Sequence, residues 1–120
     1  MRRLSIILGA AGLAASMTQA LGADPEHGKA LFAACAACHQ EKADALGPDL
    51  RGVVGRRSAA MDNFRYSNPM KRANLVWDEA NLREYIADPQ AKVRGNRMPF
   101  DGLHDPKDVD DIVEYLKTYK

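Results

Sequence analysis

The chain has 120 residues, of which 46% are hydrophobic and 28% are charged, and its formal net charge is +1. This length and composition predict one small globular domain rather than several domains or a disordered chain. The near-neutral charge, with no basic tract interleaved with aromatic residues, argues against nucleic-acid binding.

The N-terminal segment has the pattern of a secretory signal. Arg2 and Arg3 precede an uncharged, largely apolar run from Leu4 to Ala15, as expected of a signal peptide. The run is shorter than the roughly 18 to 20 apolar residues that a membrane-spanning helix needs. A retained membrane anchor is therefore the weaker alternative, and no stable membrane insertion is expected.

Small residues mark the end of this signal. We expect cleavage after Ala20, which makes residues 1–20 the signal and residues 21–120 the single mature domain. Cleavage after Ala23 is the alternative. Export across the inner membrane of a bacterium predicts a periplasmic protein.

The first helix is expected to begin just after Asp24. An Asp at the cap, Pro25 at the first position and Glu26 in the first turn are all favoured at a helix N-terminus. Leu31, Phe32 and Cys35 form the apolar face of this helix.

The end of this helix carries the most informative motif, Cys35-Ala36-Ala37-Cys38-His39, which contains both cysteines of the chain. Residues three apart on a helical turn lie on one face, so the two thiols can form thioethers with one porphyrin edge. The next residue, His39, then becomes the proximal ligand of the iron. The motif predicts one covalently attached haem.

Three other functions of the cysteine pair fit less well. A thioredoxin-like redox pair follows a strand, whereas the residues before Cys35 predict a helix. A structural zinc site needs about four ligands, and the sequence has no second cluster. A disulfide between Cys35 and Cys38 would close a very small loop and stabilise little.

Loops dominate the middle of the chain. Residues 40–61 show no helical or strand periodicity, and Gly and Pro residues interrupt them. A brief helical turn is expected to begin at Ser67 or Asn68, before Pro69, and to end near Asn74.

Two further helices are predicted in the C-terminal half. Asp78 caps one that Pro89 limits, because the residue before proline disfavours the helical region. Asp105 and Pro106 begin the last helix, whose apolar positions recur with helical spacing at Val109, Ile112, Val113 and Leu116. With no alternating strand pattern, the fold class is all-α, with three main helices and long loops.

A second axial ligand is expected from the loop of residues 95–100. Met98 lies there beside Pro99, and a thioether ligand would raise the reduction potential relative to a second imidazole. His104 is the competing ligand and would give a bis-histidine iron. His27 is a poorer candidate, because it shares a helix with the attachment motif.

With Cys35, Cys38, His39 and Met98 together, the region from Gly28 to Tyr119 resembles a small class I c-type cytochrome. The resemblance implies the cytochrome c fold around one covalently bound haem c.

The resemblance also implies roles for residues outside the haem motif. Gly28 and Phe32 would pack against Tyr115 of the last helix. Pro48 would accept a hydrogen bond from the His39 imidazole through its carbonyl, which fixes the tautomer.

Further residues match positions that surround the haem in this family. Arg56, Tyr66 and Trp77 would contact a propionate, and Tyr85 would contact the methionine sulfur. Asn96 and Phe100 would flank Met98 in its loop.

Two features depart from the family pattern. Met70 stands where many members have an internal asparagine, which predicts a more apolar pocket. The segment between His39 and Gly47 is shorter than in mitochondrial members, which favours a bacterial relative.

These features predict a monomeric periplasmic carrier that is not an enzyme. It would shuttle single electrons from a quinol-oxidising complex or dehydrogenase to a terminal oxidase or reductase. The alternatives are a dedicated cytochrome subunit of one oxidoreductase and a five-coordinate haem protein that binds small ligands.

Charge distribution adds a hypothesis about redox partners. Removing Arg2 and Arg3 from the 17 basic residues leaves 15 against 16 acidic residues, a net charge near −1. Basic residues precede Met98 and acidic residues begin the last helix, so a charge dipole could orient the protein toward an acidic partner. The residues concerned are Lys92, Arg94 and Arg97 and, in the last helix, Asp105, Asp108, Asp110 and Asp111.

Overall fold

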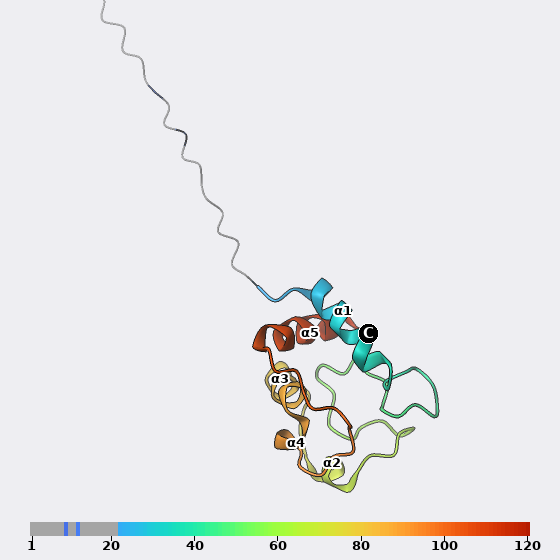
Figure 1. Ribbon diagram of the computed structural model, residues 1–120. Coiled ribbons are helices and arrows are strands. Elements are labelled where there is room, and N and C mark those ends of the chain that lie inside the picture. The colour runs from blue at the N-terminus through green and yellow to red at the C-terminus, as the bar shows by residue number, and fades with distance from the viewer. Residues whose placement is uncertain (1–8, 10–11, 13–21) are drawn as a thin grey trace, which may run out of the picture.

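The computed structural model describes residues 9, 12 and 22–120, so nearly all of the expected signal, including cleavage after Ala20, lies outside the described residues. The helices are α1 (Pro25–Ala36), α2 (Asn68–Arg72), α3 (Glu79–Ala87), α4 (Pro89–Lys92) and α5 (Pro106–Thr118) (Figure 1). No helix of the described part is long and apolar enough to cross a membrane.

Helix α1 begins as its sequence predicts. The Asp24 side chain accepts hydrogen bonds from the backbone N–H groups of Glu26 and His27, which satisfies two donors that have no partner within the helix. Pro25 occupies the first turn, where a missing N–H costs nothing.

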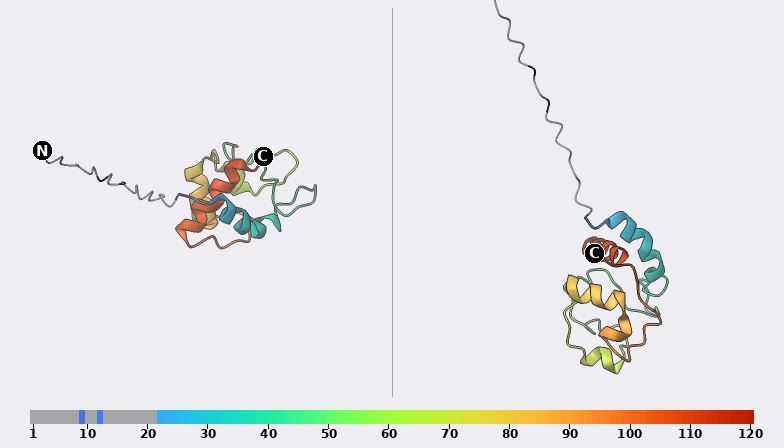
Figure 2. Two further views of the ribbon diagram at one scale, coloured as in Figure 1. Left: turned by 90° about the horizontal axis from the view of Figure 1, so that it is seen from above. Right: turned by 60° about the vertical axis from the view of Figure 1, so that its left-hand side comes forward.

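Helices α1 and α5 lie against one another and join the two ends of the domain (Figure 2). At their contact, a Cβ on Gly28 would overlap the backbone carbonyl of Asp111, so only glycine allows this approach. The predicted aromatic contact is confirmed: the rings of Phe32 and Tyr115 have centroids 5.3 Å apart. Tyr119 adds a second aromatic contact to Phe32 at 4.9 Å.

The shorter helices differ in detail from the sequence expectation. Helix α2 ends at Arg72, and Asn74 just beyond it has a φ of 50°, a left-handed conformation that asparagine tolerates. Helix α3 ends before Pro89 as predicted. Pro89 then begins the short helix α4, which was not predicted because four residues are too few to show a periodicity.

The segment between α1 and α2 has no helix, and its pairing with the chain before α3 is short. Arg57 and Val76 form an isolated antiparallel bridge. Beside it, the N–H of Trp77 donates to the Arg56 carbonyl at 2.7 Å, and Gly55 donates to the Trp77 carbonyl at 2.8 Å. These bonds hold Arg56 and Trp77 next to each other across the loop.

The core lies between α1, α3 and α5 and continues into the loops. Its buried side chains come from these segments and from α2: Phe32, Val53, Met70, Trp77, Leu82, Val93, Ile112, Val113 and Leu116. The all-α class is therefore correct, and the long loops are packed against the helices rather than free.

Candidate functional site

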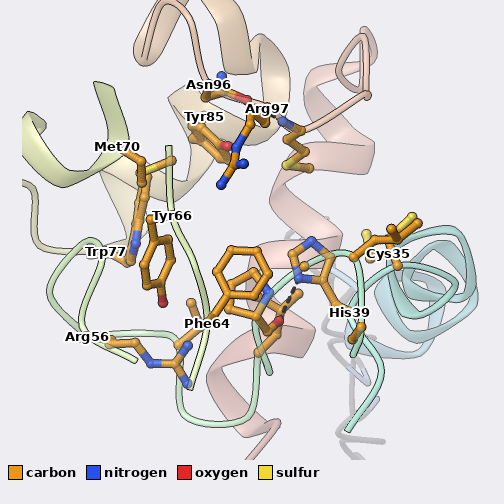
Figure 3. Close-up of a pocket in the computed structure, with 18 of the residues that line it drawn as sticks. Cys35, His39, Arg56, Phe64, Tyr66, Met70, Trp77, Tyr85, Asn96 and Arg97 are labelled. Atoms are coloured by element: carbon orange, nitrogen blue, oxygen red, sulfur yellow. Dashed lines mark hydrogen bonds between the residues drawn. The ribbon is translucent and has the colours of Figure 1, made fainter. Parts of the chain in front are cut away.

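A pocket of about 570 Å³ opens between the helices and the long loops. Its volume falls within the roughly 300–1,000 Å³ range typical of pockets that bind small molecules and cofactors. Figure 3 shows Cys35 and His39 along one side, with Met70, Tyr66 and Trp77 on the facing side.

The attachment motif lies where α1 ends. The N–H groups of Cys38 and His39 both donate to the Cys35 carbonyl, at 3.1 and 3.0 Å, so the chain turns tightly there. Both cysteines are free, half-buried thiols that line the pocket. Burial raises the pKa of the Cys35 thiol above its usual 9.0, with a smaller contribution from Cys38.

The imidazole of His39 is held in one tautomer. Its Nδ1 lies 2.7 Å from the Pro48 carbonyl oxygen, and a carbonyl can only accept, so Nδ1 carries the proton. The Nε2 lone pair is then available to a metal ion in the pocket. Burial lowers the pKa of His39 below its usual 6.5, and the hydrogen bond to Pro48 opposes this shift in part. Because the pKa is lowered, the ring is neutral at neutral pH.

Gly47 makes room for this ring. A Cβ at Gly47 would lie 2.5 Å from Cε1 and 2.6 Å from Nδ1 of His39, which is closer than side chains can approach. The N–H of Gly47 also donates to the Cys38 carbonyl at 2.9 Å. That bond closes the intervening loop and brings the Pro48 carbonyl against the imidazole.

Met98 also lines the pocket, from the loop between α4 and α5. The Asn96 side chain accepts a hydrogen bond from the Met98 N–H at 2.9 Å, and the Phe100 N–H donates to the Met98 carbonyl at 2.9 Å. Phe100 is half-buried and does not line the pocket.

The competing histidines do not line the pocket. His104 is exposed in the loop before α5. His27 is hydrogen-bonded through Nδ1 to Asp111. The pocket geometry therefore favours Met98 over either histidine as a partner for His39.

Aromatic side chains form the wall that faces the attachment motif. Trp77 and Tyr85 pack with ring centroids 4.9 Å apart, and the Tyr66 hydroxyl accepts a hydrogen bond from the Met61 N–H at 3.2 Å. Burial raises the pKa of Tyr85 to about 12, so its hydroxyl stays a hydrogen-bond donor. Met70 is buried beside this wall, in agreement with the predicted apolar character.

The cations of the pocket are all arginines: Arg56, Arg57, Arg65 and Arg97. Arg56 donates to the backbone carbonyls of Asp49 and Arg51, at 2.7 and 2.5 Å, which fixes its guanidinium at the pocket wall. Arg97 donates to the Arg65 carbonyl at 2.6 Å and so connects the Met98 loop to the opposite loop. These four arginines outnumber the one lining carboxylate, that of Asp44, so the pocket rim is basic.

The predicted charge dipole is only partly correct. Of the three cations that precede Met98, Arg97 lines the pocket, Arg94 is exposed and Lys92 forms an ion pair with Glu84. At the acidic end, Asp111 is completely buried rather than exposed, and Asp110 pairs with Arg83 at 2.9 Å. Burial and pairing reduce the field that these charges project into solvent.

Ten of the eleven predicted site residues line the pocket, and Phe100 is the exception. The ten are Cys35, Cys38, His39, Pro48, Arg56, Tyr66, Trp77, Tyr85, Asn96 and Met98.

Sequence reasoning missed Phe64, which lines the pocket and packs edge-on against Tyr66 at 4.9 Å. The sequence offered one signal for it, because Phe64 is an aromatic residue two positions before the predicted pocket residue Tyr66, in a loop without periodicity.

These residues fit a covalently attached haem. Two free thiols three residues apart, a neutral imidazole with Nε2 available and a thioether all border one largely apolar pocket. Gly47, with no Cβ, leaves space for the imidazole. Thiols, imidazole and thioether are the protein groups that attach and ligate haem c.

Comparison with known proteins agrees with this chemistry. The family model described as Cytochrome c matches residues 25–120. Cytochrome c2 iso-2 of Magnetospirillum molischianum is 44% identical over 91 residues, which cover 74% of this chain and 94% of that protein. Cytochrome c2 of Blastochloris viridis is 38% identical over 122 residues, covering 99% and 94%.

A solved structure of a related protein has the same fold. Cytochrome cH from Methylobacterium extorquens superposes with a TM-score of 0.75 and 45% sequence identity, covering 79% of this chain and 98% of that one. The chain therefore belongs to the cytochrome c family and is a class I c-type cytochrome, a monohaem electron carrier rather than an enzyme, with one covalently attached haem c.

Proposed function

We propose that this protein is a periplasmic shuttle that carries single electrons between a quinol-oxidising complex or dehydrogenase and a terminal oxidase or reductase. The observation that carries the proposal is the hydrogen bond from His39 Nδ1 to Pro48. It directs Nε2 to the same pocket that Cys35, Cys38 and Met98 line.

In this proposal Cys35 and Cys38 would form the two thioethers, and His39 and Met98 would ligate the iron. When bound, the haem iron supplies one-electron chemistry by alternating between the ferric and ferrous states. The Pro48 carbonyl keeps the His39 proton on Nδ1 and increases the basicity of Nε2. With His39 and Met98 both bound to the iron, no site would remain for a substrate.

The pocket wall tunes this chemistry. Apolar and aromatic side chains exclude water and lower the local dielectric, which favours the less charged ferrous state. Arg56, Tyr66 and Trp77 offer a cation and polar donors to the haem propionates, and Tyr85 offers a protonated hydroxyl to the Met98 sulfur.

Compartment and partners follow from the sequence expectation. The pattern of residues 1–20 predicts export, with cleavage after Ala20, and covalent haem attachment is expected on the outer side of the inner membrane. A soluble monomer would meet its donor and acceptor in turn. A dedicated subunit would stay bound to one oxidoreductase.

Optical spectra of the purified protein in both redox states, with its intact mass, test the proposal. The expected mass is that of residues 21–120 plus one haem, and the ferric protein should show the weak band near the red end of the visible spectrum that marks sulfur ligation. Met98→Ala should abolish this band and admit cyanide or CO. Met61→Ala is the matched control and should retain it.

Other results would contradict parts of the proposal. A wild-type ferric protein without the sulfur band, and with rapid cyanide binding, would indicate the five-coordinate alternative. Elution of the native periplasmic protein with an oxidoreductase during size exclusion would indicate a dedicated subunit.

A further inference from the structure

The side chain of Asn96 is buried at the start of the Met98 loop, with 7% of its surface exposed. Its Nδ2 donates to the carbonyls of Pro89 and Val93, at 2.9 and 2.8 Å. Its Oδ1 accepts the hydrogen bond from the Met98 N–H at 2.9 Å. One amide thus joins the first residue of α4 and the residue after its last to the backbone of Met98.

These bonds leave Asn96 no donor for a ligand. An asparagine side chain has two N–H donors, and both point to backbone carbonyls of α4 and of the residue after it. The family resemblance implied that Asn96 flanks Met98, and the hydrogen bond from the Met98 N–H to its Oδ1 gives that position a physical role. Figure 3 shows Asn96 next to Arg97 and above Tyr85, at the edge of the pocket.

Gln90 makes a second connection between α4 and the same loop, which offers a natural comparison. Its amide nitrogen donates to the Asn96 carbonyl at 2.9 Å, and its amide oxygen accepts from the Gly95 N–H at 3.1 Å. Gln90 is exposed and its bonds stop at Asn96. Among the described side chains, Asn96 alone donates to or accepts from the backbone of Met98.

We propose that Asn96 is a positioning residue, which fixes the backbone of Met98 and so holds the Met98 thioether in the pocket. The inference rests on the proposed axial role of Met98. A loop that is fixed before ligation has little conformational entropy left to lose when its side chain binds. The buried amide fixes the backbone of Met98, so the sulfur competes effectively with external ligands for the same position.

The test compares Asn96→Ala with Gln90→Ala in the haem-loaded protein, using imidazole as the external ligand. We expect imidazole to bind ferric Asn96→Ala about tenfold more tightly than the wild type, because one buried hydrogen bond to the loop contributes about that factor. The reduction potential should fall as sulfur ligation weakens. Gln90→Ala should stay within about twofold of the wild type, since the Gln90 side chain is exposed and makes no bond to Met98.

Two results would overturn the inference. If imidazole affinity were unchanged in Asn96→Ala, or rose equally in both variants, the side chain would have no particular role at Met98. The wild-type ferric spectrum separates this from failure of the proposed function, because absence of the sulfur band would remove Met98 as a ligand irrespective of either variant.

A measurement on the wild type decides the question if Asn96→Ala fails to fold or to take up haem. The Met98 amide should exchange with deuterium at least about tenfold more slowly than the Arg97 amide, whose N–H has no hydrogen-bond partner among the described residues. Equal exchange rates would show that the bond between Asn96 and Met98 is not maintained, and would overturn the inference.

Discussion

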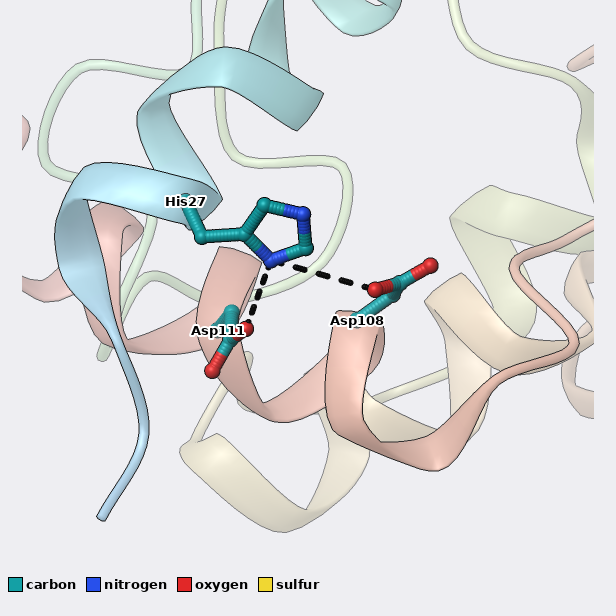
Figure 4. Close-up of side chains that lie close together, drawn as sticks. All are labelled: His27, Asp108 and Asp111. Atoms are coloured by element: carbon teal, nitrogen blue, oxygen red, sulfur yellow. Dashed lines mark hydrogen bonds and ion pairs between the residues drawn. The ribbon is translucent and has the colours of Figure 1, made fainter. Parts of the chain in front are cut away.

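His27 Nδ1 lies 2.7 Å from Oδ2 of Asp111, a carboxylate that is completely buried where α1 crosses α5 (Figure 4). The other oxygen of Asp111 accepts the Asp24 N–H at 2.7 Å, and Lys107 lies 3.0 Å from Oδ2. The Asp24 N–H and then His27 lower the pKa of Asp111 to about 2. The buried Asp111 carboxylate of α5 therefore binds two groups at the start of α1.

This arrangement predicts that the free energy of unfolding depends on pH. The contribution of His27 is lost as the pH rises, whereas that of Asp111 is lost as the pH falls. The pKa of His27 is raised above 6.5, chiefly by its hydrogen bond to Asp111, with Asp108 adding to the effect and Lys107 opposing it. Its contribution is therefore complete below about pH 6.5 and lost as the pH rises through the folded-state pKa. The contribution of Asp111 is present above about pH 4 and lost toward pH 2.

Replacement of His27 by glutamine removes the titrating group from α1. We expect the free energy of unfolding of His27→Gln to lie below that of the wild type at pH 5.5, and the difference to shrink by pH 9. Urea unfolding of the ferrous protein at several pH values measures this. A difference that stays constant with pH would mean that His27 makes no charged contact in the folded protein.

The close approach of α1 and α5 predicts a cost for any side chain at Gly28. Alanine usually stabilises a helix interior relative to glycine, but here its Cβ would overlap the Asp111 carbonyl. We expect Gly28→Ala to destabilise the protein by about 1–3 kcal/mol, as overpacking does. Denaturant unfolding measures it, and the neighbouring exposed variant Lys29→Ala should change stability by less than about 0.5 kcal/mol.

Gly47 tests the support of the imidazole. Its Cβ in Gly47→Ala would be 2.5 Å from the His39 ring, so the ring must shift away from the Pro48 carbonyl. We expect a less basic His39, weaker proximal ligation and a lower yield of spectroscopically normal haem protein. Lys42→Ala, an exposed change in the same loop, is the control. Identical spectra for both variants would contradict the role given to Gly47.

The basic rim predicts salt-dependent encounter with an acidic redox partner. Arg57 and Arg65 are exposed and line the pocket, so reversal of both charges should reduce the association rate constant about tenfold at low ionic strength. At about 1 M salt, where the screening length is roughly 3 Å, the difference should disappear. Stopped-flow electron transfer measures it, with Lys29→Glu on α1 as the control. A salt-independent deficit would indicate damage to the haem site instead of lost steering.

Local signals in the sequence predicted the attachment motif and the starts of the main helices. The spacing of Cys35, Cys38 and His39 is fixed by one helical turn, and caps such as Asp24 and Asp78 act on N–H groups two or three residues away. Such features depend on neighbours in sequence and are therefore readable without a structure. Helix α4 could not be predicted, because four residues are too few to show a helical periodicity of apolar positions.

The remaining properties depend on residues that are distant in sequence. Asp111 looked like one more surface acid at the start of α5, yet packing against α1 buries it and gives it partners 84 and 87 positions away. Asn96 was expected only to flank Met98, and the placement of α4 determines that both of its N–H donors bind backbone carbonyls.

The sequence by itself determined the cofactor, the all-α class and the pair of axial ligand candidates, because covalent attachment needs specific side chains at a fixed short spacing. Only the tertiary structure decided which polar groups face the pocket and which are used inside the protein. A polar side chain acts on whatever donor or acceptor lies within about 3 Å of it, and that neighbour is set by the packing of whole helices and loops.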